Sequence, residues 1–291
     1  PNAMNDEIDN AGKTAQAAPV FIVTGSTDAM GSLITRRLAE QGKPVLLASR
    51  NLVKAQQYAE LLRKETKNND IQCLQLDLNS FELVQDFVAR LTALNRPVAA
   101  LINNAGNLPR RASVSPNGYD HCVQVNFLST ALLSMLVAPL IVEGGRIIMS
   151  TSITRRLVSL PYEFPNISHF TQIGSYAQSK LALTLFSIYI STTLKTRRII
   201  VNCVNPGIIK SSMVALNKWV DKMADYLVKP LKSNTAGVVP TMRALESNDT
   251  GFIFEGNSRQ IKMSSVLNNR DVFIKLCQDT MRILKKYLPQ K

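Results

Sequence analysis

The sequence predicts one α/β domain built on a doubly wound parallel sheet. Short runs of β-branched and aliphatic residues alternate along the 291-residue chain with longer segments of helical periodicity. Apolar strands that alternate with helices are typical of βαβ units, in which helices cover both faces of a parallel sheet. No internal repeat and no long linker interrupts this alternation, so we expect residues 19–291 to form a single domain.

The elements follow from these patterns in chain order. The runs Val-Phe-Ile-Val-Thr and Val-Leu-Leu-Ala are apolar enough for buried strands, and later runs repeat the pattern. The predicted strands are residues 20–24, 45–48, 71–76, 98–102, 146–150, 199–204 and 251–255. Apolar residues at helical spacing predict helices over residues 30–41, 52–67, 80–94, 117–138 and 271–287, and over a segment that carries Tyr176 and ends near residue 195.

Two long segments lack a regular pattern. Residues 153–175 contain two prolines and a glycine, and residues 208–235 contain a proline and many lysines. Long excursions at the carboxyl edge of a parallel sheet often form a substrate pocket or lid. We therefore expect these segments, with residues 107–116, to wall a substrate pocket. Plain surface decoration is the alternative.

Composition argues against nucleic-acid binding. The formal net charge is +13 and the pI is about 9.7, but the basic residues occur as scattered pairs such as Arg110-Arg111 and Arg155-Arg156. No block of five basic residues occurs, and aromatic residues do not alternate with them. A solvated basic face, or attraction for a phosphorylated cofactor, explains the charge more simply.

Targeting signals are also not evident. The best apolar stretch, residues 131–142, is too short to span a bilayer and contains Pro139, so we expect no membrane span and a cytoplasmic location. Residues 1–18 are polar and read as a disordered tail, in which residues 1–3 before Met4 are interpreted as a cloning remnant. The four cysteines are far apart and are expected to be reduced and buried. The two histidines, His121 and His169, lack metal-ligand spacing, so no metal site is predicted.

Tyr176 and Lys180 are the main catalytic candidates. They stand four residues apart, so a helix places them on one face, and Ser152 follows an apolar run upstream. A fixed ammonium group near a tyrosine hydroxyl lowers the pKa of the phenol, which could then exchange a proton near neutral pH. A second Tyr-Lys pair, Tyr287 and Lys291, has no such neighbours and is interpreted as accidental.

A glycine-containing turn predicts a nucleotide site. Residues 24–31 connect the first strand to the first helix, where Gly25 would make the tight turn and Gly31 would let helix and strand pack closely. Thr27 and Met30 in this turn would lie next to a bound dinucleotide. The amino end of the helix would face its pyrophosphate. An ordinary strand-to-helix turn is the alternative.

Polar and small residues at three other strand ends extend this site. Asp77 and Leu78 follow the third strand, and Asn104, Ala105 and Gly106 follow the fourth, where they could line an adenine–ribose cleft.

Arg50 follows the second strand, where a ribose 2′-phosphate would lie, and this position favours NADP over NAD. Asp28 would favour NAD if it faced the same phosphate.

Taken together, these motifs resemble the short-chain dehydrogenase/reductase family, whose fold is a Rossmann-type sheet. The similarity covers residues 19–287 and rests on Thr24-Gly25…Gly31, Asn103-Asn104-Ala105-Gly106, Asn126, Ser152, Tyr176/Lys180 and Pro206-Gly207. Residues 47–51 and 176–182, and the long segment between Ser152 and Tyr176, are most similar to the retinol dehydrogenase-like members.

The resemblance implies a role for each matched residue. Tyr176 would be the general acid or base, Lys180 would hold the nicotinamide ribose, and Ser152 would polarise the substrate oxygen. Asn126 would help to hold a water for proton relay. The residues implied to shape the nicotinamide pocket are Pro206, Gly207 and Ile209.

The expected activity is NADP(H)-dependent interconversion of a carbonyl and an alcohol on a moderately apolar small molecule. Ala29 stands where the family has a glycine, and with Asp28 it predicts weaker cofactor binding. Two rivals are therefore kept: a cofactor-binding scaffold or sensor with little turnover, and a reductase of ketoacyl groups on a carrier protein. The apolar run of residues 181–190 predicts a homodimer or homotetramer, with burial inside one subunit as the alternative.

Overall fold

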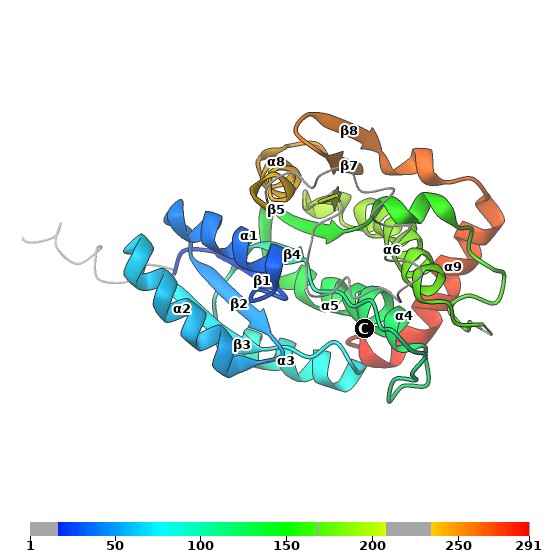
Figure 1. Ribbon diagram of the computed structural model, residues 1–291, viewed down its shortest axis with the longest axis horizontal. Coiled ribbons are helices and arrows are strands. Elements are labelled where there is room, and N and C mark those ends of the chain that lie inside the picture. Colours follow the sequence, from blue (N-terminus) through cyan, green and yellow to red (C-terminus); the bar gives the residue numbers. More distant parts are fainter. Residues whose placement is uncertain (1–16, 168, 208–233, 291) are drawn as a thin grey trace, which may run out of the picture.

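The computed structural model describes residues 17–167, 169–207 and 234–290 and contains one eight-stranded sheet (Figure 1). The strand order is β3-β2-β1-β4-β5-β6-β7-β8, with every pair parallel except β7 and β8. The strands are β1 (Val20–Thr24), β2 (Val45–Ser49), β3 (Ile71–Gln75), β4 (Val98–Asn103), β5 (Ile141–Ser150), β6 (Ile200–Asn205), β7 (Phe252–Glu255) and β8 (Arg259–Lys262).

Helices cover both faces of this sheet, because its strands carry apolar side chains on both faces. One face packs against α1 (Ala29–Glu40), α2 (Leu52–Thr66) and α8 (Val239–Glu246). The other face packs against α3 (Phe81–Ala93), α5 (Ser129–Val137) and α6 (Gln172–Thr193), with α9 (Arg270–Leu284) outside α6 (Figure 1). The predicted α/β class, the single sheet and its doubly wound layout are confirmed.

The chain order of the strands reverses beside β1, and this reversal positions the site. From β1 the chain builds outward through β2 and β3, then returns to place β4 on the other side of β1. Ligands bind at such a switch point, beyond the carboxyl ends of the strands. The ends of β1 and β4 are joined there, because the amide of Ala105 donates a 2.9 Å hydrogen bond to the hydroxyl of Thr24.

The structure differs from the predicted elements in four places, one of which is α8, a helix that the sequence patterns do not predict. β5 begins at Ile141 rather than at residue 146, and β8 was not predicted. The helix predicted from residue 117 begins at His121, because Ser115 and Gly118 close a turn with Gly118 at φ +87°. That helix is also interrupted. A short α4 (His121–Val123) leads into a π-helical turn (Gln124–Leu128) before α5 begins.

The apolar run on α6 is buried within one chain. Residues 181–187 and Ile190 of this helix are buried, and α9 packs along its outer side (Figure 1). Leu276 and Leu284 of α9 belong to the same apolar core as Leu183 and Phe186 of α6. This run therefore does not itself require a partner subunit, and the alternative of burial inside one subunit accounts for it.

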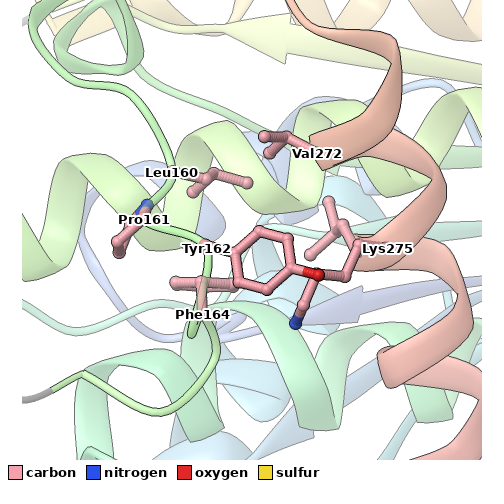
Figure 2. A pocket seen from close by; sticks show the side chains of 7 residues that line it. Leu160, Pro161, Tyr162, Phe164, Val272 and Lys275 are labelled. Carbon is pink, nitrogen blue, oxygen red and sulfur yellow. The ribbon is translucent and has the colours of Figure 1, made fainter.

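The segment between Ser152 and α6 is anchored on α9. Figure 2 shows Leu160, Pro161 and Tyr162 facing Val272 and Lys275 across a small depression. The ammonium of Lys275 lies 4.6 Å from the centroid of the Tyr162 ring. The carboxy-terminal helix thus holds one of the segments predicted to wall the substrate pocket.

One helical stretch among the described residues, His121–Leu140, is long and apolar enough to cross a membrane. Within the protein, 72% of its apolar window is buried, which is typical of a core helix. Two other predictions concern positions outside the described residues: most of the amino-terminal tail, and nearly all of residues 208–235 with Ile209 among them.

We predict that replacing Leu284 by Ala destabilises the isolated domain. Leu284 is fully buried where α9 joins the core, so its truncation should cost about 2–5 kcal/mol of unfolding free energy. Ile274, 40% exposed on the same helix, is the matched control, and Ile274→Ala should cost less than about 0.5 kcal/mol. Urea denaturation measures both, and equal losses would show that α9 is not part of this core.

Candidate active site

The turn after β1 is shaped by two glycines. Gly25 has φ +61°, a left-handed conformation that favours glycine. A Cβ on Gly31 would lie 2.0 Å from the Gly25 carbonyl oxygen, so only glycine allows this approach of helix and turn. The side-chain amide of Asn104 donates to the carbonyls of Thr24 and Gly25, at 3.1 and 3.3 Å. The structure thus brings Asn104 to the predicted nucleotide turn.

The amino end of α1 faces the end of β2. Ala29 is the first residue of α1 and is not among the described residues with positive φ, so the backbone accommodates its Cβ. The hydroxyls of Thr27 and Ser49 lie 3.2 Å apart, which places the turn beside exposed Arg50. Asp28 makes no side-chain hydrogen bond to the helix end. Its carboxylate instead lies near Gly25, 3.2 Å from where a Cβ would be.

Gly106 lies beside the catalytic candidates and directly follows Ala105, which contacts the predicted nucleotide turn. A Cβ on Gly106 would lie 3.2 Å from the Asn126 side-chain oxygen and 3.3 Å from the Lys180 ammonium nitrogen. Both polar groups therefore approach the backbone of the loop that follows β4, which contains Gly106 and Asn107 and is called the β4 loop. Any larger side chain at this position would crowd them, so Gly106 keeps the surface in front of Lys180 open.

Asn126 is held from both sides of its amide. Its side-chain oxygen accepts a 2.7 Å bond from the amide of Asn107, and its side-chain nitrogen donates to the Asn107 carbonyl at 2.9 Å. The same nitrogen also donates to the hydroxyl of Ser179 on α6, at 3.1 Å. Asn126 lies in the π-helical turn, a distortion common at functional sites, and links the β4 loop to α6.

Lys180 is buried beneath the carboxyl end of β5. Its side-chain nitrogen donates a 2.8 Å hydrogen bond to the Ser150 carbonyl, and the residue is only 3% exposed. Burial lowers the pKa of Lys180 to about 8, because the charged form loses its hydration. One turn further along α6, the hydroxyls of Thr184 and Thr151 lie 2.7 Å apart and fix the helix against the strand.

Tyr176 lies on the same face of α6 as Lys180. The lowered pKa predicted for its phenol is wrong, because the pKa is raised. The Lys180 ammonium lies 5.7 Å from the centroid of the Tyr176 ring. Burial raises the pKa of Tyr176 to about 12, and a hydrogen bond with the side chain of Ser152 only partly opposes this rise. Loss of hydration by the phenolate outweighs this hydrogen bond, so the phenol is protonated at neutral pH.

Ser152 caps the segment that follows β5 and also contacts Tyr176. Its hydroxyl oxygen accepts bonds from the amide and the hydroxyl of Thr154, at 3.3 and 3.0 Å, and so caps a short helical turn (Ile153–Leu157). A hydrogen bond between the same side chain and Tyr176 lowers the pKa of the phenol, although burial raises it more. The serine therefore holds the start of the following segment and the phenol together.

The remaining predicted residues lie at other strand ends. Asp77 accepts a 2.9 Å bond from the amide of Asn79, which leaves its side chain folded back on its own loop. Leu78 is buried in the core, and Met30 is half-buried. After β6, the amide of Gly207 donates to the side chain of Asn205 at 3.1 Å, and Pro206 lies between them.

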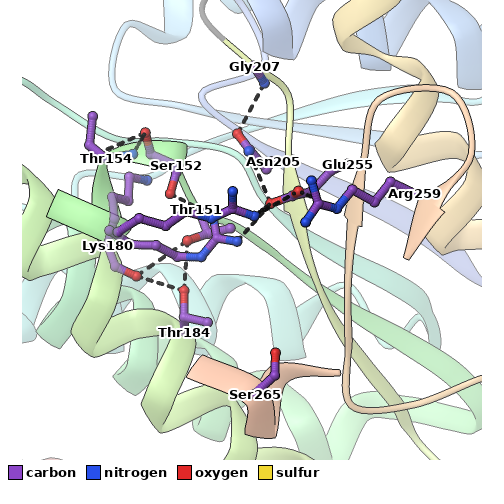
Figure 3. A network of polar contacts seen from close by, with 12 residues as sticks. Thr151, Ser152, Thr154, Lys180, Thr184, Asn205, Gly207, Glu255, Arg259 and Ser265 are labelled. Carbon is purple, nitrogen blue, oxygen red and sulfur yellow. Dashed lines mark hydrogen bonds and ion pairs between the residues drawn. The ribbon is translucent and has the colours of Figure 1, made fainter. Parts of the chain in front are cut away.

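A buried ion pair close to Ser152 was missed. Arg155, interpreted as part of a scattered surface pair, is only 2% exposed and donates to Glu255 at 2.7 Å. It also donates to the Ser152 carbonyl at 2.8 Å. Figure 3 shows Glu255 with Asn205 and Arg259, beside Ser152 and Lys180. The two partners are a hundred residues apart, so only the fold reveals the pair.

Comparison with known proteins identifies the family. Residues 19–221 match the family model for short chain dehydrogenases. The chain is 29% identical over 218 residues to human polyprenol dehydrogenase, covering 72% of this chain and 66% of that protein. It is 28% identical over 198 residues to retinol dehydrogenase 12 of Bos taurus, covering 67% of this chain and 63% of that protein. The chain thus spans just under two thirds of the length of these relatives.

The fold is shared with solved structures. One is a short chain dehydrogenase from Escherichia coli complexed with NADPH, which aligns with a TM-score of 0.63 at 23% identity. The alignment covers 82% of this chain and 97% of that one. The match to the family model, the retinol dehydrogenase-like relatives and the Rossmann-type fold agree, and this chain belongs to the short chain dehydrogenase family.

Proposed function

We propose that this protein is an NADP(H)-dependent oxidoreductase that interconverts a carbonyl and an alcohol on a moderately apolar small molecule. The observation that carries the proposal is the meeting of Ser152, Tyr176 and Lys180 at the carboxyl end of β5. These side chains adjoin the glycine turn through Gly106. Relatives named polyprenol dehydrogenase and retinol dehydrogenase 12 support an alcohol or carbonyl substrate.

The residues at the carboxyl edge fit a nicotinamide dinucleotide. The close approach of Gly31 to the Gly25 carbonyl leaves the amino end of α1 facing the crevice beyond β1. The pyrophosphate would bind there, with Asn104 keeping the turn in shape. Gly106 and Lys180 would border the nicotinamide ribose, because a side chain at residue 106 would crowd that ammonium. A bound cofactor of this kind supplies or takes up the hydride.

Tyr176 would move the proton of the reaction. In reduction, the phenol gives its proton to the substrate oxygen while the carbonyl carbon gains a hydride, so an alcohol forms. A pKa of about 12 keeps the phenol protonated at neutral pH, which suits it to this direction. The resulting phenolate would be stabilised by Lys180, whose ammonium is 5.7 Å from the ring centroid. Ser152, already bonded to Tyr176, would donate to the same substrate oxygen.

Asn126 would position this machinery from the side. Both of its amide atoms are bonded to the backbone of Asn107, so its direct effect is to hold the β4 loop against α6. A water held for proton relay beside it stays a prediction. The homodimer or homotetramer and the cytoplasmic location also stay predictions, the first testable by light scattering of the purified protein.

A cofactor-binding sensor or scaffold with little turnover is the alternative to this oxidoreductase proposal. The carboxylate of Asp28 lies near Gly25, where it would repel a pyrophosphate. Saturable cofactor binding without turnover on any aldehyde or ketone would favour this rival over the oxidoreductase.

We predict that Tyr176→Phe abolishes turnover while cofactor binding persists. Loss of the proposed proton donor should lower kcat by about 10²-fold or more, the usual contribution of a positioned general acid. Stabilisation by NADPH in a thermal-shift measurement should equal that of the wild type. Tyr189→Phe, on the same helix, is the matched control and should keep full activity with an aldehyde and ketone panel. Persistent turnover in Tyr176→Phe would refute the assigned proton donor.

Arg50 should decide the preference between cofactors. We predict that NADPH stabilises the wild type more than NADH does, because the guanidinium would pair with the 2′-phosphate. Arg50→Gln should weaken NADPH binding about 10-fold and leave NADH binding unchanged. Lys54→Gln, which removes an equal exposed charge, should change neither. If wild type and Arg50→Gln bind both cofactors alike, another residue sets the preference.

A further inference from the structure

A groove lies on the side of α6 that faces β8 and the start of α9. Its volume is about 580 Å³, within the range of small-molecule sites. The groove is bounded by the segment after Ser152, by α6, by β8 and by the start of α9. Its apolar lining consists of Val158, Leu160, Leu181, Leu185, Ile261, Val266, Leu267 and Val272. Neither Tyr176 nor Ser152 lines it, so it is distinct from the catalytic side chains.

One end of the groove carries three guanidinium groups. Arg155, Arg156 and Arg259 all line it, and all three pair with Glu255, at 2.7, 3.2 and 3.5 Å. Three positive charges thus share one carboxylate, which leaves an excess of two at this end. Arg156 and Arg259 are 42% and 60% exposed in their side chains, so both can also meet a ligand from solvent.

Arg155 has an unused donor at the same end. Its side chain is only 1% exposed, and its Nε atom has no hydrogen-bond partner within the described part of the chain. A buried guanidinium N–H without an acceptor is costly, so a ligand carboxylate beside Arg156 and Arg259 would also lower the electrostatic cost of this buried cation. An apolar wall ending in excess positive charge matches a molecule that is apolar at one end and anionic at the other.

We propose that this groove binds an amphiphile with an apolar chain and a single carboxylate. The chain would lie along the leucine and valine lining between α6 and α9. The carboxylate would pair with Arg156 and Arg259, whose planar guanidinium groups suit bidentate recognition. Glu255 would keep its bond to Arg155, so binding does not require the buried pair to break. The site takes no part in hydride transfer.

Decanoate is the probe, measured by isothermal titration calorimetry below its micellar concentration and without cofactor. Wild-type protein should bind decanoate, and the uncharged 1-decanol should bind at least about 10-fold more weakly. The double variant Arg156→Gln/Arg259→Gln leaves the Arg155–Glu255 pair in place and should weaken decanoate binding about 10-fold or more. It should leave 1-decanol binding unchanged.

Two further variants make the result specific. Arg37→Gln/Arg198→Gln removes the same net charge at exposed sites away from the groove and should bind decanoate as the wild type does. Ser265→Trp introduces a large side chain from an exposed lining position and should abolish binding of both probes.

Several outcomes would overturn the proposal. The first is a wild-type protein that does not bind decanoate, the result expected if a segment of the same chain fills the groove. The second is equal affinity of the wild type for decanoate and 1-decanol. The third is an affinity of the Arg156→Gln/Arg259→Gln variant for decanoate equal to that of the wild type. Because no turnover is measured, these outcomes are independent of whether the oxidoreductase proposal holds.

Discussion

The burial of one ammonium group beneath the sheet edge is the constraint on which the site depends. Lys180 reaches from α6 to the carbonyl of Ser150, the last residue of β5, and lies beside Gly106 and Asn126. An interior lysine is costly, and this cost is expressed as a pKa lowered to about 8. A bound polar group that accepts a hydrogen bond from this ammonium would relieve that cost. The lysine would therefore connect the proposed cofactor binding at the strand ends to the proposed chemistry at Tyr176.

The second half of the fold is built to hold that helix in place. Thr184 bonds to Thr151 on the sheet side, Asn126 bonds to Ser179 on the loop side, and α9 packs along the outer side. The same α9 anchors the segment that follows Ser152 (Figure 2). Because α6 is fixed on three sides, Tyr176 and Lys180 cannot change their spacing relative to β5 without loss of core packing. Rigid support of this kind is what a proton donor needs.

Local patterns predicted the segments that form the parallel strands and the proximity of Tyr176 to Lys180. They failed where contacts between distant parts of the chain decide the structure. β1 and α2 match their predicted ranges closely because hydrophobic periodicity is a local property. The edge strand β8 has four mostly polar residues and carries no such pattern. Burial of Arg155 depends on Glu255, far along the chain. The raised pKa of Tyr176 depends on burial by tertiary packing, which the Tyr176–Lys180 spacing does not reveal. Residue spacing shows which groups meet, whereas their solvation follows from the whole fold.

The titration of Lys180 is the most direct test of this account. Protein labelled with ¹³C at the lysine Cε carbon can be titrated by NMR, with Lys180→Met identifying the signal. The account predicts a midpoint near pH 8, because burial disfavours the ammonium. Saturation with NADPH should raise this midpoint, since its phosphates and ribose hydroxyls favour the charged form. A midpoint at the usual value near 10.5, or one that NADPH does not move, would contradict the placement of Lys180 at a buried nucleotide-facing edge.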